Sequence, residues 1–150
     1  MKHSLKQDIG YWLNRLAHEV ELGFEQRLAK FGITAAQWSI LVAINNSDAD
    51  SITKLAKFIE IDKGTVSRTV ERLHAKKLIV IQQGNDRRST ILSLTMTGKK
   101  LIQNLIKCAL DNENFYFGSL EISEKQQFKH ILHKLITQLP NITIDGWIKP

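Results

Sequence analysis

The feature that most constrains the fold is a change in the spacing of apolar residues between positions 78 and 94. On either side of this segment, apolar side chains recur every three or four residues, which is the spacing of one helical face. Within it, Leu78–Ile81 and Thr90–Leu94 are short runs rich in β-branched residues, separated by the polar stretch Gln82–Arg88. This pattern is typical of a β-hairpin. The sequence therefore predicts a mainly helical chain with one small hairpin.

The N-terminal third contains signals for two helices. Apolar residues follow a helical period from Ile9 to Phe31, and Gly32 is suited to end that helix because glycine readily adopts a left-handed backbone. Thr34 followed by Gln37 forms a capping box, which predicts that a second helix starts there and ends near Asn45. No repeat or flexible linker interrupts the 150 residues, so we expect a single domain.

Two short amphipathic helices follow, one from about Thr53 and one after Asp62, which is a suitable N-cap. Between them lies a tight turn at residues 60–62. In the second of these helices the predicted inward residues are Val66, Val70 and Leu73. The residues predicted to project from its other side are Thr65, Arg68, Thr69 and Arg72. This arrangement is a helix-turn-helix, and a hairpin that directly follows one is a wing.

Helical spacing resumes after Thr95 or Thr97, and Ser123 with Gln126 predicts a capping box for a final helix that stops at Pro140. The first, fifth and sixth predicted helices have broad apolar faces. A single chain of this length would have difficulty covering them, so we expect them to form an interface with a second copy. The alternative is an ordinary helical core.

The positive charge is concentrated in one part of the chain. The formal net charge is +6, and residues 51–88 hold nine basic and four acidic side chains, which is +5 of that total. Clustered Lys and Arg displace counterions from a phosphate backbone, so this segment indicates a nucleic-acid partner. The alternative is a solvated surface that is basic by chance.

Several classes of protein are not expected. The chain has no motif for phosphate-loop, dinucleotide-binding, serine-hydrolase or zinc-protease chemistry, so we predict no enzymatic activity and no cofactor. His130 and His133 lack a nearby third ligand, so no metal site is predicted. We expect Cys108, the only cysteine, to be a buried thiol in a reducing, cytoplasmic setting. Neither a secretory signal nor a membrane-spanning segment is evident.

Four stretches of the sequence resemble the MarR family of winged helix-turn-helix transcription regulators. The most specific are Asp86–Ser89, which is similar to the family's Asp-x-Arg wing signature, and Leu94-Thr95 with Gly98, which is similar to its wing-to-helix junction. The remaining stretches are Phe31–Thr34 with Gln37 and Leu41, and Leu55-Ala56 with Ile61, Thr65–Arg68 and Leu73. One departure is Lys77, where the family often has glycine.

The resemblance implies a homodimer that binds double-stranded operator DNA. It divides the domain into a winged-helix lobe at about residues 34–96 and dimerisation helices at about residues 5–31 and 97–140. Each subunit would present one winged helix to a near-palindromic operator, as a ligand-responsive repressor does. A winged helix used to bind protein or RNA, without small-molecule control, is the alternative.

The residues expected to contact DNA lie on the second helix of the motif and on the wing. Arg68 is expected to read a base, because Arg with guanine is the commonest specific pairing in the major groove. Arg72 is expected to contact phosphate, and Asp86 to brace a wing arginine. The full expected set is Lys63, Thr65, Ser67, Arg68, Arg72, Asp86, Arg87 and Arg88.

Many relatives release DNA when a small aromatic acid binds, and the resemblance implies a comparable effector here. Arg15 could pair with a carboxylate while aromatic side chains pack against the ring. The expected effector-binding residues are Tyr11, Arg15, His18 and Trp38. The alternative for Trp38, and for Trp12 of the first helix, is a place in the core.

Overall fold

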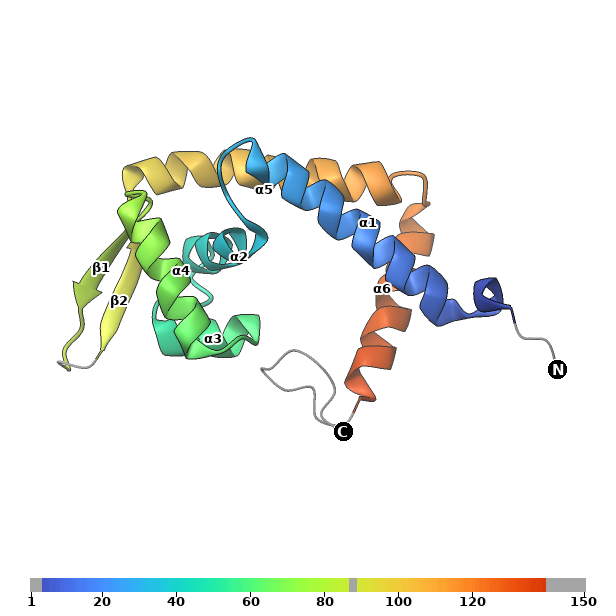
Figure 1. Cartoon of the computed structure of the whole chain (residues 1–150), viewed down its shortest axis with the longest axis horizontal. Coiled ribbons are helices and arrows are strands. Elements are labelled where there is room, and N and C mark those ends of the chain that lie inside the picture. Colours follow the sequence, from blue (N-terminus) through green and yellow to red (C-terminus); the bar gives the residue numbers. More distant parts are fainter. Residues whose placement is uncertain (1–3, 87–88, 140–150) are drawn as a thin grey trace.

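The computed structural model describes residues 4–86 and 89–139. Its helices are η1 (Leu5–Gln7), α1 (Ile9–Ala29), α2 (Ala35–Asn45), α3 (Ile52–Ile59), α4 (Lys63–Ala75), α5 (Met96–Phe117) and α6 (Ile122–Thr137), and its strands are β1 (Ile79–Gln83) and β2 (Thr90–Leu94) (Figure 1). The predicted order of helices and strands is confirmed. The predicted fold class, mainly helical with a two-stranded wing, is also confirmed.

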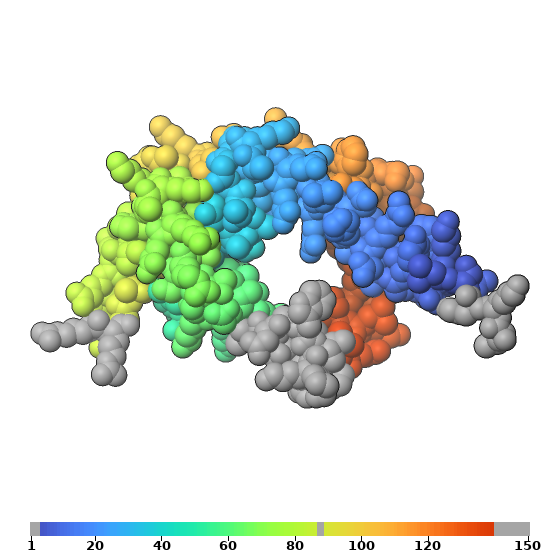
Figure 2. Space-filling model, viewed as in Figure 1, coloured from blue at the N-terminus to red at the C-terminus, as the bar shows by residue number. Residues whose placement is uncertain are grey.

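Two long helices join two ends of the molecule. α1 packs along α5, and the Asn112 side chain of α5 donates a hydrogen bond to the Val20 carbonyl of α1 at 3.1 Å. The winged lobe, made of α2, α3, α4 and the hairpin, lies at one end, and α6 lies at the other (Figure 1). Figure 2 shows that α1 and α5 bridge these two ends.

The core sits inside the winged lobe and extends onto the long helices. Its fully buried side chains come from α1, α2, α3, α4, β1 and α5, and the largest are Leu28, Ile40, Leu41, Leu55, Leu73, Ile79, Ile102 and Leu105. α6, by contrast, contributes no buried side chain. Apolar residues along α1 and α6 stay in contact with solvent, among them Ile9, which is 83% exposed, and Ile122, which is 77% exposed.

The local signals place most helix starts correctly. Thr34 caps α2 and Gln37 completes the box, since the Thr34 N–H donates to Gln37 Oε1 at 3.2 Å. Asp62 caps α4, and Thr95 caps α5 by accepting the Gly98 N–H at 3.0 Å. The capping box predicted at Ser123 is wrong. α6 begins at Ile122, because Glu124 accepts the Glu121 N–H at 2.8 Å and so starts the helix earlier.

The hairpin is antiparallel, with Ile79 opposite Leu94 and Gln83 opposite Thr90. The sequence predicts Gln82 and Gln83 to lie in the loop, but both residues continue β1. They pair with Ile91 and Thr90, so their backbone groups find partners across the ladder.

Two predictions about burial are wrong. Thr69 does not project outward, since it is 7% exposed and its hydroxyl donates to the Thr65 carbonyl at 2.8 Å. That hydrogen bond satisfies the polar group and lets the side chain pack inward. Trp12 is not a core residue in this chain, because it is 53% exposed and its indole N–H donates to the Lys6 carbonyl at 2.9 Å. Cys108 is buried, as predicted.

Candidate nucleic-acid interface

The turn between α3 and α4 sets the angle of the candidate recognition helix. Glu60 ends α3 in a left-handed backbone conformation, with φ of 62°. The Ile61 N–H donates back to the Ala56 carbonyl at 3.1 Å, and Asp62 then caps α4. α4 is anchored by Val66 and Val70, which are at most 1% exposed, so its opposite side faces solvent.

The start of α4 is organised around Asp62. Its Oδ1 accepts the Thr65 N–H at 2.8 Å. Hydrogen bonds from Thr65, together with the nearby Arg68 guanidinium, hold the pKa of Asp62 below its ordinary value. Arg68 Nη2 donates to Thr65 Oγ1 at 3.1 Å, so the guanidinium lies back over the first turn of the helix. Arg68 is thus oriented toward the end of a recognition helix that contacts base edges.

The expected DNA-contacting residues in the described part of the chain all lie at the surface. Lys63, Arg68, Arg72 and Asp86 are exposed, and Thr65 and Ser67 are half-buried. Arg87 and Arg88 lie outside the described residues. At the base of the loop, the Ser89 N–H and hydroxyl both donate to the Asp86 carbonyl at 2.9 Å, which closes the turn.

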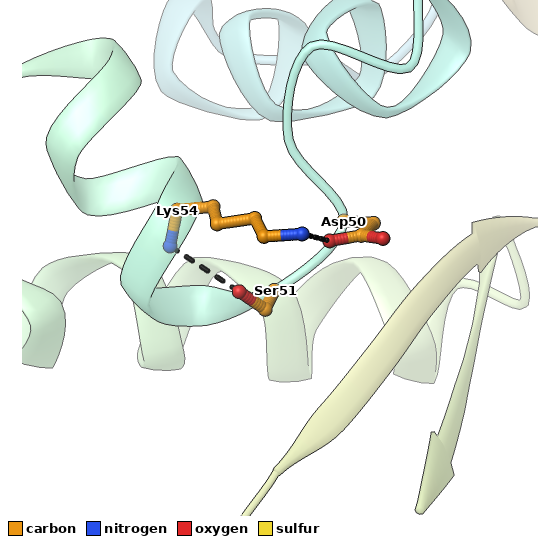
Figure 3. A network of polar contacts seen from close by, with 3 residues as sticks. All are labelled: Asp50, Ser51 and Lys54. Carbon is orange, nitrogen blue, oxygen red and sulfur yellow. Dashed lines mark hydrogen bonds and ion pairs between the residues drawn. The ribbon is translucent and has the colours of Figure 1, made fainter. Parts of the chain in front are cut away.

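Two cations of the basic segment are engaged within the protein. The Lys54 ammonium donates to Asp50 Oδ1 at 2.7 Å, while its backbone N–H is capped by Ser51 (Figure 3). The hydrogen bond from Lys54 lowers the pKa of Asp50. The Lys76 ammonium donates to the Gly32 carbonyl and to Gln37 Oε1. Sequence reasoning missed both, because their partners are not visible in the charge count.

The expected effector residues do not share one site in this chain. Trp38 lines a cavity of about 340 Å³ between α1, α2, α5 and α6. The other three, Tyr11, Arg15 and His18, line a separate open depression along the first turns of α1. Sequence reasoning missed most of the cavity, whose lining residues are Val20, Phe24, Trp38, Ala109, Asn112, Glu113, Phe117, Leu120, Lys125, Phe128, Lys129 and Leu132.

Four of the twelve residues that line the cavity are aromatic, and α6 contributes two lysines. Trp38 and Phe24 meet edge to face, with ring centroids 5.7 Å apart. The ring centroids of Phe117 and Phe128 are 6.1 Å apart. Lys125 is half-buried, whereas the Lys129 ammonium lies 3.8 Å from Glu113. Such a surface suits a flat apolar ring that carries a negative group.

Neither a metal centre nor a membrane span is found in the described ranges. Across residues 4–86 and 89–139, no three His, Cys, Asp or Glu side chains gather closely enough to hold an ion. His130 and His133 are both exposed on α6. No helix in those ranges is long and apolar enough to cross a bilayer.

This geometry defines a class of protein: a winged helix-turn-helix with a solvent-facing recognition helix and long flanking helices. The sequence profile of the MarR family matches residues 31–89, which span the helix-turn-helix and most of the wing. The chain belongs to the MarR family of winged helix-turn-helix transcriptional regulators, which is not a family of enzymes.

Individual relatives align with most of this chain. The transcriptional repressor NicR of Pseudomonas putida is 27% identical over 135 residues, which cover 89% of this chain and 85% of the repressor. Bordetella bronchiseptica BpsR, whose DNA binding is regulated by 6-hydroxynicotinic acid, superimposes with a TM-score of 0.78 at 28% identity, covering 89% of this chain and 98% of BpsR. Staphylococcus aureus MepR, in a complex with DNA, superimposes with a TM-score of 0.79 at 25% identity, covering 91% of this chain and 100% of MepR.

Proposed function

We propose that this regulator is a ligand-responsive repressor that binds a near-palindromic operator as a homodimer. The observation that carries the proposal is the exposed N-terminal half of α4, where Thr65 holds the Arg68 guanidinium in place. It is supported by NicR, a repressor, and by MepR, whose structure includes DNA. Half-sites would lie about one duplex turn apart, roughly 10 bp, or a multiple of it.

Each expected contact residue has a distinct part in this proposal. Arg68 reads a base in the major groove, and Lys63, Thr65 and Ser67 contact bases or phosphates around it. Arg72 contacts phosphate from the next turn of α4. On the wing, Arg87 and Arg88 enter the minor groove, and the Asp86 carboxylate braces one of these arginines.

The test is selection of bound fragments from genomic DNA, followed by mobility shifts with variants. Arg68→Ala should cost roughly 1–3 kcal/mol of binding and relax sequence preference at one position of each half-site. Arg72→Ala is the matched control, which should weaken binding evenly across sequences. Normal operator binding by Arg68→Ala would remove Arg68 from the interface, and equal affinity for single-stranded RNA would favour the alternative function.

We propose that the domain has the division expected from its sequence. Residues 34–96 form the DNA-binding lobe, and about 5–31 and 97–140 form the dimerisation helices. The support is the exposed apolar surface of these helices, including Ile9, Leu110 and Ile122, each at least 62% exposed in the single chain. Large apolar side chains left exposed on several helices of a single chain are typical of an interface between proteins.

The effector in this proposal is a small aromatic acid bound in the cavity next to Trp38. Its ring would pack among Phe24, Phe117 and Phe128, and Lys125 would pair with the carboxylate. Trp38 lies on the winged lobe and Phe24 on a long helix, so an occupant would contact both. BpsR, which responds to 6-hydroxynicotinic acid, supports an acid of this class. A site that also used Tyr11, Arg15 and His18 would need the α1 of a second chain.

A thermal-shift screen of aromatic acids, including 6-hydroxynicotinate, tests the effector. A ligand should raise the melting temperature of the protein and release it from the operator. Lys125→Met should weaken this response, whereas Lys134→Met, which removes an equivalent charge from α6 outside the cavity, should leave it unchanged. If no acid stabilises the protein or releases DNA, the cavity is not an effector site.

A further inference from the structure

The C-terminal end of α4 is tied to a distant part of the chain through one lysine side chain. Lys76 is the C-cap of α4, and its ammonium donates to the Gly32 carbonyl, 44 residues earlier. It also donates to Gln37 Oε1 at 3.2 Å. Both acceptors belong to the corner where α1 turns into α2.

The acceptors at this corner are themselves held in place. Gly32 has φ of +67°, and its N–H donates to the Ala29 carbonyl at 3.0 Å at the end of α1. Gln37 is 5% exposed, and its Oε1 also accepts the Thr34 N–H as part of the α2 capping box. Lys76 therefore connects α4 to a corner that has little freedom to move independently of α1.

The exit of α4 is held on its other side by the start of α5. Thr95 Oγ1 donates to the Lys77 carbonyl at 2.7 Å, and the Thr95 N–H donates to the Leu78 carbonyl at 3.0 Å. Gly98 lies so close to that Leu78 carbonyl that a Cβ at this position would clash with it. The end of the candidate recognition helix is thus tied both to the α1–α2 corner and to the start of α5, beside which it lies in Figure 1.

We propose that Lys76 is a positioning residue that joins the recognition helix to the α1–α2 corner, so that a displacement of α1 is carried into the angle of α4. This inference rests on the proposed DNA-binding function. Two of the three ammonium protons of Lys76 are used within the protein, so this side chain is less available to phosphate than a lysine without internal acceptors. The test must therefore distinguish a lost phosphate contact from a lost internal tie.

Salt dependence makes that distinction. Each phosphate contact contributes about 0.9 to the slope of log K against log salt concentration. Lys76→Met keeps the aliphatic length and removes the donor, so operator affinity should fall roughly three- to tenfold with the slope unchanged. Lys77→Met removes the same charge from the neighbouring position, whose ammonium makes no hydrogen bond or ion pair with the described residues. It should change affinity less, and any loss should come with a smaller slope.

A second measurement uses the unmodified protein and does not depend on how the variants fold. Limited acylation, read residue by residue by mass spectrometry, should modify Lys76 more slowly than Lys77, both without DNA and with it. Lysines that contact phosphate should instead become protected only when the operator is added.

The outcomes separate this inference from the proposed function. If the wild-type protein selects no DNA, the proposed function fails. If it binds DNA and Lys76→Met binds equally well, the inference is overturned. It is also overturned if the Lys76→Met slope drops by about one, or if Lys76 is acylated as fast as Lys77 until DNA is added.

Discussion

Arg68 and Lys76 lie on and at the end of the same helix, yet their cationic groups are used differently. The Arg68 guanidinium rests on Thr65 at the exposed start of α4. The Lys76 ammonium is bound to a carbonyl and an amide oxygen of the α1–α2 corner. At the scale of single residues, function depends on the partner of each charge and not on how many charges there are.

Lys77 is a residue whose backbone conformation is unfavourable for its type. It follows α4 with φ of 57°, and the Leu78 N–H behind it donates to the Leu73 carbonyl at 3.0 Å. The departure from the family's glycine is therefore real, and the chain still makes the left-handed turn that glycine would favour.

Lys77→Gly should raise the free energy of unfolding. Relief of left-handed strain is worth about 1–2 kcal/mol, and the added flexibility of the unfolded chain offsets about 0.5–1 kcal/mol, so a net gain of up to about 1.5 kcal/mol is expected. Urea denaturation measures it. Lys30→Gly is the matched control, since Lys30 is an exposed helix C-cap with φ of −60° and should lose stability. If both variants lost the same free energy of unfolding, the left-handed backbone of Lys77 would not be a source of strain.

At the scale of elements, α4 is held at both ends by different means. Asp62 caps its start with a side chain from within the turn. Its end is held by Lys76, whose ammonium reaches outside the helix-turn-helix to the α1–α2 corner. Thr95, which lies outside the motif at the start of α5, holds the same end. The start of the helix is therefore a local feature, whereas its end depends on the long helices.

The cap at Asp62 predicts a pH dependence of the α4 start. Because hydrogen bonds from Thr65 depress the pKa of Asp62 in the folded state, the cap contributes stability above the ordinary pKa of an aspartate. That contribution is lost as the pH falls through the lower, folded-state pKa. Hydrogen exchange at the Thr65 amide should therefore accelerate at acid pH, beyond the change expected for an unstructured peptide.

Asp62→Asn is the control for this titration. The amide oxygen still caps α4, but it has no charge to lose, so the extra acceleration should disappear. A wild-type protein whose Thr65 exchange follows that of Asp62→Asn across the acid range would show that the carboxylate does not hold the start of the helix.

At the scale of the whole molecule, the distribution of buried residues is uneven. The winged lobe holds most of the core, while α6 contributes no buried side chain and carries exposed apolar groups such as Leu135 and Ile136, each about half exposed. α6 is thus the element least accounted for by a single chain, which is the reason for proposing a dimer.

Ile131 and Leu135 lie one turn apart on α6 and give a direct test of assembly. The double variant Ile131→Glu, Leu135→Glu should convert a dimer into monomers in sedimentation experiments, because two charges would be placed in an apolar interface. Phe58→Glu is the matched control, since Phe58 is 55% exposed on α3 in the winged lobe and should leave assembly unchanged. A double variant that sediments as the wild type does would exclude this face of α6 from the interface.

The sequence by itself determined the order of helices and strands, the helix-turn-helix and the outward orientation of Arg68. These follow from local causes: apolar period, N-caps such as Thr34 and Asp62, and turn residues. It misplaced the start of α6 for a local reason too, since Glu121 and Glu124 provide an equally plausible cap.

Only the tertiary structure decided which groups meet across the chain. It joined Lys76 to the α1–α2 corner, and it placed Trp38 in a cavity formed mostly by α5 and α6. The physical reason is distance along the chain. A hydrogen bond between residues 32 and 76, or a cavity that joins residues 24 to 132, depends on how helices pack, and neither periodicity nor charge count records that packing.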